Sequence, residues 1–263
     1  MVGTQFDINI TNLTGLAASW KNPGVLFALS DLSQPFIAAM DTDGSYHQAF
    51  FLQDPGAIDF QDMSVGPCPS GTCLYLADIG GKVSASRVEF AIFRFAEPTV
   101  SGTTVEITSV AFERFRFAYP DGANHDAASM LVDPKAGTIY VITKVGAGKP
   151  STAYALPQPL SSSAVNVARK VADLAVPRPG DMPAVGASAH PCGLGFLLRT
   201  RNATFEFRVP PGAAFETAFA ASPVVVPSVT EPQAEAISYR YDGRGYVTSG
   251  GPEPAPIFEA TCP

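Results

Sequence analysis

Four acidic residues from well-separated parts of the chain could supply the oxygen ligands of a hard cation. They are Asp31, Asp78, Asp126 and Glu235, and each lies beside an end of a short apolar segment. Calcium binds about six to eight oxygen ligands, often carboxylates joined by backbone carbonyls and water. If the fold brings these carboxylates together, we expect them to bind Ca2+. The structural alternative is that each carboxylate caps a turn or pairs with a nearby Lys or Arg.

His125 adjoins Asp126, and the chain contains only 3 histidines. A histidine beside a carboxylate is a candidate general base, because imidazole titrates close to neutral pH. The pair therefore predicts a catalytic role for His125 and Asp126. The structural alternative is a loop histidine that is hydrogen-bonded to the turn at residues 120–122. The sequence contains no three-His or His-Glu-His arrangement, which argues against catalytic zinc.

The elements that must position these residues recur five times along the chain. Each recurrence opens with a short segment of small and apolar residues, and successive segments begin about 45 to 67 residues apart. These segments are 16–19, 61–65, 128–132, 184–188 and 235–239. A period of this length with several strands inside it is typical of a β-propeller, whose blades surround a central axis. The sequence therefore predicts an all-β fold, a five-bladed β-propeller. A two-sheet sandwich competes with it, because it also has many short strands.

The two ends of the chain complete one another in this prediction. The last repeat has only three clear strands, and the alternating segment Phe6–Ile10 has no partner within its own repeat. If the N-terminal strand completes the last blade, the ring closes without an exposed sheet edge. We therefore expect one domain over 1–263, with blades at about 14–55, 56–122, 123–176, 177–229 and 230–263 plus 5–11.

The predicted ring would place the candidate residues at one end of its channel. In a propeller, the loops that enter the innermost strands and the loops that leave the second strands meet around the channel mouth, an expectation that rests on the fold alone. The residues gathered there would be Asp31, Asp78, His125, Asp126, Lys144, Arg199 and Glu235. If the ring forms in this way, we expect a ligand site at this mouth.

Composition narrows the class of partner. The formal net charge is −7, which argues against nucleic acid or an anionic membrane surface as the main partner. No apolar run approaches the roughly 18 residues of a transmembrane helix. We expect a small-molecule partner, no membrane span and a monomer.

The cysteines indicate the cellular compartment. Cys68 and Cys73 flank a short turn, which predicts a disulfide across a hairpin. A metal site is the alternative, but no second Cys pair or nearby His completes it. Cys192 and Cys262 would then pair by elimination, although four cysteines allow three pairings and the sequence does not choose among them. Disulfides are typical of exported proteins, so we expect a secreted or periplasmic location.

Several blade segments resemble those of a known group. The segments are 22–27, 59–62, 75–80, 140–144, 198–200 and 234–237. They are similar to blade motifs of bacterial exported propeller proteins, mostly without assigned function, which are distantly similar to esterase-like phytase and gluconolactonase-type propellers. The resemblance covers roughly residues 14 to 260.

The departures from the group's pattern concern its acidic positions. The group has Asp-Trp-Glu-Asp, Asp-Ile-Gly-Asp-Asn and Asp-Ala-Glu-Ala at 59–62, 78–82 and 126–129, where this chain lacks two glutamates and one aspartate. If these carboxylates bind metal in the group, the resemblance implies that this chain binds it more weakly or not at all. Asp78, Lys144, Arg199 and Glu235 match the group and form the predicted ligand-binding set. Charges of both signs suit an anionic or zwitterionic small molecule as well as a cation.

Two functional hypotheses follow. The first is an exported propeller that binds a small polar ligand at the channel mouth without catalysis, because acidic positions are missing. The alternative is a calcium-assisted hydrolase of lactone or ester type. In that enzyme the metal would polarise a carbonyl oxygen, and His125 or Asp126 would transfer the proton. The sequence leaves open whether the protein is an enzyme.

Overall fold

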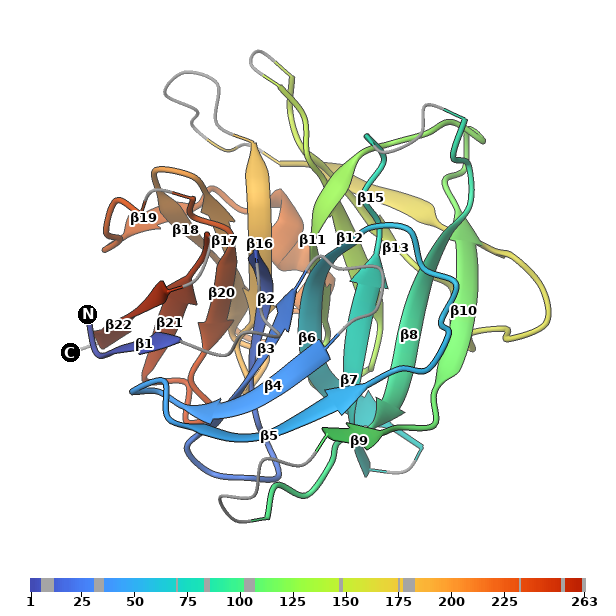
Figure 1. Cartoon of the computed structure of the whole chain (residues 1–263). Helices are drawn as coiled ribbons and strands as arrows, with labels where there is room; N and C mark the ends of the chain where they lie inside the picture. The colour runs from blue at the N-terminus through green and yellow to red at the C-terminus, as the bar shows by residue number, and fades with distance from the viewer. Residues whose placement is uncertain are drawn as a thin grey trace.

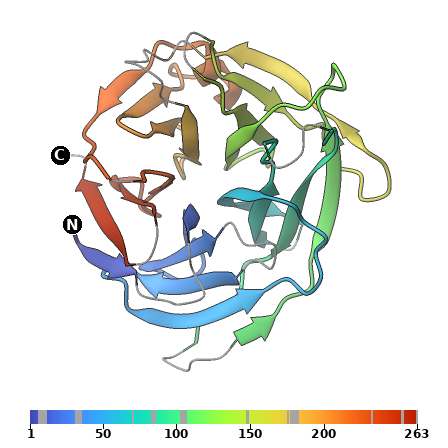
Figure 2. The same ribbon diagram turned by 45° about the horizontal axis from the view of Figure 1, so that its top comes forward.

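Five small β-sheets surround a central axis in this computed structural model. The structure describes residues 1–5, 12–30, 36–69, 71–82, 86–101, 107–146, 149–174, 176, 183–231, 233–251 and 254–261. Figure 2 shows the sheets arranged as a ring. The prediction of an all-β, five-bladed propeller is confirmed, and the sandwich alternative is excluded.

Each blade is an antiparallel sheet whose first strand is innermost (Figure 1). Blade 1 contains β2 (Leu13–Ala18), β3 (Val25–Ser30), β4 (Phe36–Asp41) and β5 (Tyr46–Phe51). Blade 2 contains β6 (Phe60–Cys68), β7 (Gly71–Asp78), β8 (Phe90–Ala96) and β10 (Glu113–Ala118). Blade 3 contains β11 (Ala127–Val132), β12 (Ile139–Thr143), β13 (Thr152–Ala155) and β15 (Arg169–Asp173). Blade 4 contains β16 (Ala184–Ala189), β17 (Gly195–Thr200), β18 (Thr204–Arg208) and β19 (Val224–Val226), with the 3-10 helix η1 (Phe215–Ala220) between its last two strands.

Blade 5 is completed by the start of the chain. It contains β20 (Ala236–Tyr239), β21 (Gly245–Ser249), β22 (Ala255–Thr261) and the N-terminal β1 (Gly3–Gln5). β1 pairs antiparallel with β22, and the two ends of the chain lie side by side in Figure 1. This confirms the predicted closure. The strand expected at residues 6–10 lies outside the described residues, and the described closing strand is β1.

Two additional strands cover the outer edges of blades 1 and 2. β9 (Ile107–Ser109) pairs parallel with β5, and β14 (Asn166–Val167) pairs parallel with β10. Each of these strands lies in a segment of the following blade: β9 is in blade 2 and β14 is in blade 3. Asn166 secures β14, because its side-chain amide donates to the Arg116 carbonyl oxygen at 2.8 Å. A covered edge cannot pair with another chain, which protects these two blades.

Small residues open the innermost strands because these strands converge on the axis. A Cβ atom on Gly15 would lie 2.9 Å from the backbone nitrogen of Met63 in the next blade. A Cβ atom on Gly186 would lie 2.4 Å from the carbonyl oxygen of Glu235. Every residue of β2 and of β11 is buried, since both faces of a blade pack against neighbouring blades. The repeated small-residue segments in the sequence therefore mark the points of closest approach between blades.

A buried carboxylate lies among the innermost strands. Asp62 is fully buried on β6, and its Oδ1 accepts a hydrogen bond from its neighbour Met63 N at 2.9 Å. Its Oδ2 accepts bonds from Met130 N at 2.8 Å and Ala187 N at 3.2 Å. Asp62 therefore joins the innermost strands of blades 2, 3 and 4. Burial raises the pKa of Asp62, and the three N–H donors oppose that rise.

Serine hydroxyls make comparable bonds around the rest of the ring. Ser188 Oγ accepts a bond from Tyr239 N at 2.9 Å, and Ser238 Oγ accepts one from Ala18 N at 2.8 Å. Ser188, Ser238 and Ser64 line a cavity of about 20 Å3, which has room for about one water molecule. The axis is therefore lined by polar as well as apolar groups.

The cysteine predictions have different outcomes. Cys68 and Cys73 form a disulfide at the tip of the β6–β7 hairpin, as predicted. Cys192 carries a free, exposed thiol, which corrects the expected pairing with Cys262; Cys262 lies outside the described residues. A disulfide is typical of a protein in an oxidising compartment. Within the described part of the chain, no helix is long and apolar enough to cross a membrane.

The substitution Asp62→Asn tests the buried carboxylate. The amide keeps one acceptor oxygen but directs an NH2 group toward backbone N–H donors. Leaving these donors unsatisfied should lower the free energy of unfolding by about 3 kcal/mol, as measured in urea. Ser64→Ala is the control, because the Ser64 hydroxyl makes only a 3.4 Å contact with the Val65 carbonyl oxygen. Equal stability of Asp62→Asn and the wild type would contradict this role.

Candidate functional site

The connection that leaves β7 lies at the end of the ring where the innermost strands begin, which we call the channel mouth. Gly80 N donates to the Asp59 carbonyl oxygen at 3.3 Å, and Gly81 N donates to Asp126 Oδ1 at 2.9 Å. Asn124 Nδ2 donates to the Gly81 carbonyl oxygen at 2.9 Å. This connection therefore lies between the segments that lead into β6 and β11, where the sequence placed the site.

Glycine is required in this connection because acidic residues lie against it. A Cβ atom on Gly80 would fall 1.8 Å from Asp59 Oδ2. A Cβ atom on Gly81 would fall 2.8 Å from the Cα atom of Asp126. The Gly-Gly pair thus allows both acidic residues to approach the end of β7.

Asp78 is a structural carboxylate rather than an open ligand group. It is buried, and its Oδ1 accepts bonds from Ile58 N at 3.2 Å and Asp59 N at 2.8 Å. Its Oδ2 lies 2.8 Å from Arg87 Nη2, and both side chains are almost fully buried. Asp78 therefore has a partner on each oxygen.

Arg87 secures the β7–β8 connection. Its Nη1 donates to the Gly80 carbonyl oxygen at 2.7 Å, and its Nη2 donates to the Asp78 carbonyl oxygen at 2.8 Å. The guanidinium also lies over the Phe90 ring, 4.6 Å from its centroid. Arg87 was not predicted as a functional residue, because it lies in a connection without strand periodicity. The sequence feature that could have indicated Arg87 is its position shortly after Asp78, one of the candidate ligand residues.

Asp59 and Asp126 are the half-buried carboxylates of this mouth. Gln61 Nε2 donates to Asp59 Oδ1 at 2.6 Å. Asp126 Oδ2 lies 3.6 Å from Lys82 Nζ and accepts no hydrogen bond among the described residues. Burial raises the pKa of Asp59, and the negative charge of Asp126 adds to that rise against the bond from Gln61. Negative charge at this mouth is therefore incompletely balanced.

His125 makes the contact expected from its structural interpretation. Its Nε2 lies 2.8 Å from Asp121 Oδ2, and this bond lowers the pKa of Asp121. Its ring packs against Tyr119 and Tyr154, with centroid distances of 4.8 and 5.9 Å. The catalytic role of His125 with Asp126 stays a prediction.

Lys144 lies close to Asp126 along the backbone. Its N–H donates to the Asp126 carbonyl oxygen at 2.7 Å, which places it where β12 leaves the mouth. The side chain is half-buried and forms no ion pair within the described ranges. Lys144 is therefore a cation available at the same mouth as Asp59 and Asp126.

Arg199 belongs to a buried ion pair that connects blades 4 and 5. Its Nη2 lies 2.5 Å from Glu231 Oε1, and its Nη1 donates to the Ala236 carbonyl oxygen at 2.8 Å. Thr248 donates to the same Glu231 oxygen at 2.7 Å. The Arg199 side chain is 2% exposed, so it supports the ring more directly than it faces a ligand.

Glu235 is partly buried and lies 4.0 Å from Arg201 Nη2. It belongs with Arg199 at blades 4 and 5, whereas Asp78, Asp126 and Lys144 belong with blades 2 and 3. Within the described ranges, no three or more His, Cys, Asp or Glu residues gather to hold a metal ion. Asp31 lies outside those ranges, so the four-carboxylate calcium set stays a prediction.

Comparison with known proteins gives similarity of fold only. No family model matches the chain, and no curated protein matches its sequence. A nidogen/laminin complex chain has a TM-score of 0.48 and 11% identity, with 90% of this chain and 72% of that chain covered. A "putative 6-phosphogluconolactonase" from Bacteroides uniformis has a TM-score of 0.43 and 12% identity, with 94% and 67% covered. The U3-55K structure has a TM-score of 0.39 and 10% identity, with 91% and 61% covered.

Removal of one partner from the buried Arg199–Glu231 pair should be costly. Arg199→Met leaves the Glu231 carboxylate buried without its cation, and we expect a loss of about 3 to 5 kcal/mol in the free energy of unfolding. The double variant Arg199→Met with Glu231→Leu should lose less than the single variant, because no isolated charge remains. Urea unfolding of both variants and of Glu231→Leu measures the coupling. Additive losses would refute this coupling.

Asp59→Asn should stabilise the protein at pH 7. The folded-state pKa of Asp59 is raised, so the folded state binds its proton more readily and loses stability as pH rises above about 3.8. Asparagine removes this loss and still accepts the bond from Gln61. We expect a gain of about 0.5 to 1 kcal/mol at pH 7 that disappears near pH 4, measured by thermal unfolding.

The matched control for this test is Asp173→Asn. The pKa of Asp173 is lowered by bonds from Lys170 and Thr152, so its stabilisation is present at neutral pH. Its substitution should lower stability at pH 7, opposite in sign to Asp59→Asn. Loss of stability in both variants would show that the Asp59 carboxylate is not held unfavourably.

Proposed function

We propose that this protein is an exported β-propeller that binds a small zwitterionic ligand at the channel mouth between blades 2 and 3. The main support is Asp126, whose Oδ2 is buried at the mouth and accepts no hydrogen bond among the described residues. Asp59, with its raised pKa, lies on the other side of the Gly80–Gly81 connection. A ligand ammonium group would supply the missing donors and positive charge to both carboxylates.

The carboxylate of the zwitterionic ligand would pair with a lysine. The exposed Lys82 lies 3.6 Å from Asp126, and Lys144 is bonded to Asp126 through its backbone. Either ammonium group could pair with a ligand carboxylate once the ligand cation has taken Asp126. Cations and carboxylates side by side at one mouth favour a molecule that carries both signs of charge.

Calcium is the second candidate ligand, because it prefers carboxylate oxygens such as Asp126 Oδ2. Asp78 is a poor calcium ligand here, since Arg87 and two backbone N–H groups use both of its oxygens. A calcium-assisted hydrolase would also need a set of metal ligands, and among the described residues no three His, Cys, Asp or Glu side chains gather to hold one. We therefore propose binding rather than catalysis. The hairpin disulfide supports export to an extracellular or periplasmic compartment.

Thermal unfolding with defined probes tests this proposal. The probes are L-alanine and β-alanine as zwitterions, ethylamine and acetate as single-charge controls, and calcium chloride with and without EDTA. A ligand at about 100 times its Kd should add about 2.7 kcal/mol of stability. We expect a zwitterion to raise Tm more than either single-charge control.

Two variants test whether a ligand-induced rise in Tm arises from the channel mouth. Asp126→Asn should abolish the rise in Tm, whereas the surface control Asp173→Asn should keep it. A response to calcium alone would favour the metal over the zwitterion. A rise that persists in Asp126→Asn, or no rise with any probe, would refute binding at this mouth.

A further inference from the structure

A second cavity, of about 400 Å3, opens at the other end of blades 2 and 3. It is bounded by the tip of the β6–β7 hairpin, the β11–β12 turn and the segment 158–160. The 9-residue β6 runs from the channel mouth at Phe60 to this tip at Cys68, a length of about 25 to 30 Å. The cavity is therefore distinct from the mouth, and its volume lies in the range of small-molecule sites, roughly 300 to 1,000 Å3.

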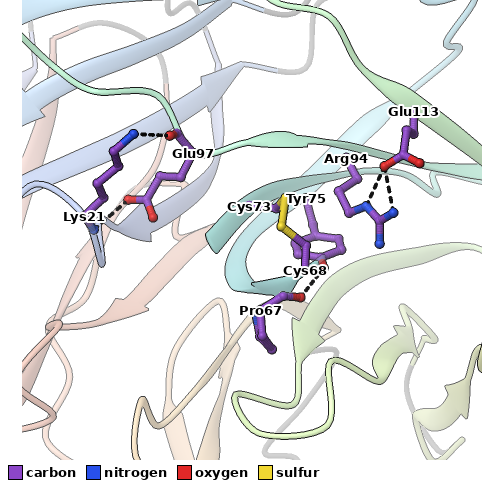
Figure 3. The surroundings of a disulfide bond; sticks show 8 residues. All are labelled: Lys21, Pro67, Cys68, Cys73, Tyr75, Arg94, Glu97 and Glu113. Carbon is purple, nitrogen blue, oxygen red and sulfur yellow. Dashed lines mark hydrogen bonds and ion pairs between the residues drawn. A yellow bond between two sulfur atoms is a disulfide. The ribbon is translucent and has the colours of Figure 1, made fainter. Parts of the chain in front are cut away.

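The apolar lining of this cavity comes from the β6–β7 hairpin and the segment 158–160. Its members are Pro67, Pro69, Tyr75, Pro159 and Leu160. Figure 3 shows the Cys68–Cys73 disulfide beside Tyr75, whose hydroxyl donates to the Pro67 carbonyl oxygen at 2.6 Å. Gln158 Nε2 donates to the Gly137 carbonyl oxygen at 3.1 Å, which fixes the segment 158–160 to the β11–β12 turn. The lining is thus held in place before any ligand arrives.

Two cations line the same cavity. Arg94 directs Nε and Nη2 to one oxygen of Glu113, at 2.9 and 2.7 Å, and Figure 3 shows its third nitrogen directed away from Glu113. Lys135 is exposed and forms no ion pair among the residues that the structure describes; its Cε lies 3.3 Å from the place a Cβ atom on Gly193 would take, in the β16–β17 turn of blade 4. Asp133, next to this lysine in the turn, accepts bonds from the Lys135 and Ala136 backbone nitrogens. Neither Glu113 nor Asp133 lines the cavity, so both charged residues of its lining are cations, of which Arg94 is paired with Glu113.

We propose that this cavity binds a small aromatic or alicyclic carboxylate. Arg94 would hold the carboxylate, and the exposed Lys135 side chain would turn from Gly193 toward it. The apolar body would pack against the prolines, Leu160 and the Tyr75 ring. Apolar walls alone would favour a neutral molecule, and exposed cations alone would favour any small anion. Walls and cations together select an anion with an apolar body. This site does not depend on the ligand proposed for the channel mouth.

Titration with matched probes tests the ligand class. Benzoate, benzamide and benzylamine share a ring but differ in charge, and inorganic phosphate is an anion without an apolar body. Saturation-transfer NMR on the full chain should show saturable binding of benzoate. Benzamide should bind at least about tenfold more weakly, which corresponds to about 1.4 kcal/mol. Benzylamine should not bind, and phosphate should not displace benzoate.

A charge-reversing substitution tests whether benzoate binds in this cavity. Lys135→Glu should weaken benzoate binding at least about tenfold. Lys149→Glu is the matched control, because Lys149 is an exposed lysine in the β12–β13 connection, outside this cavity, and should leave affinity unchanged. The proposal is overturned by equal affinity for benzoate and benzamide, by displacement with phosphate, or by equal affinity of the two variants for benzoate.

Discussion

The structure depends on how the edges of five innermost strands are satisfied where they converge. An innermost strand pairs on one side only, so its other edge presents N–H groups that need acceptors. Asp62 supplies acceptors to three blades at once, through bonds to Met63, Met130 and Ala187. Serine hydroxyls supply single acceptors elsewhere in the ring. A carboxylate suits this place because it accepts several bonds and donates none when ionised.

The same crowding divides the charged residues into two kinds. Where strands approach closely, charges are buried and fully engaged, as in the Asp78–Arg87 and Arg199–Glu231 pairs. At the rim, glycines create space, and Asp126 remains half-buried with incomplete pairing. The first kind holds the ring together, because removal of either partner leaves an isolated buried charge. The second kind is where a ligand can gain binding energy without breaking the fold.

The fold could be predicted from the sequence because a structural period and small-residue segments persist in the chain, and the extra N-terminal strand indicated how the ring closes. The site was predicted less completely. Strand spacing correctly placed Asp78 and Asp126 near one mouth, but it carries no information about the partner of a side chain. Arg87 and Glu231 lie in irregular connections, so periodicity could not show that they engage Asp78 and Arg199. The sequence placed Asp62 at the start of an innermost strand, within 59–62 and 61–65, but gave no indication of its partners, which come from strands far along the chain.

The closure by β1 gives the ring a single seam. Among the described residues, three of β1 pair with β22, whereas blades 1 and 2 each carry an additional parallel strand on the outer edge. Because strand pairing rather than a chain connection closes this seam, β1 can separate from β22 without displacing the other blades. Blades 2 and 3 lie elsewhere around the circumference and share the Asp62 bonds. Breathing at the seam can thus occur while the mouth between blades 2 and 3 keeps its shape.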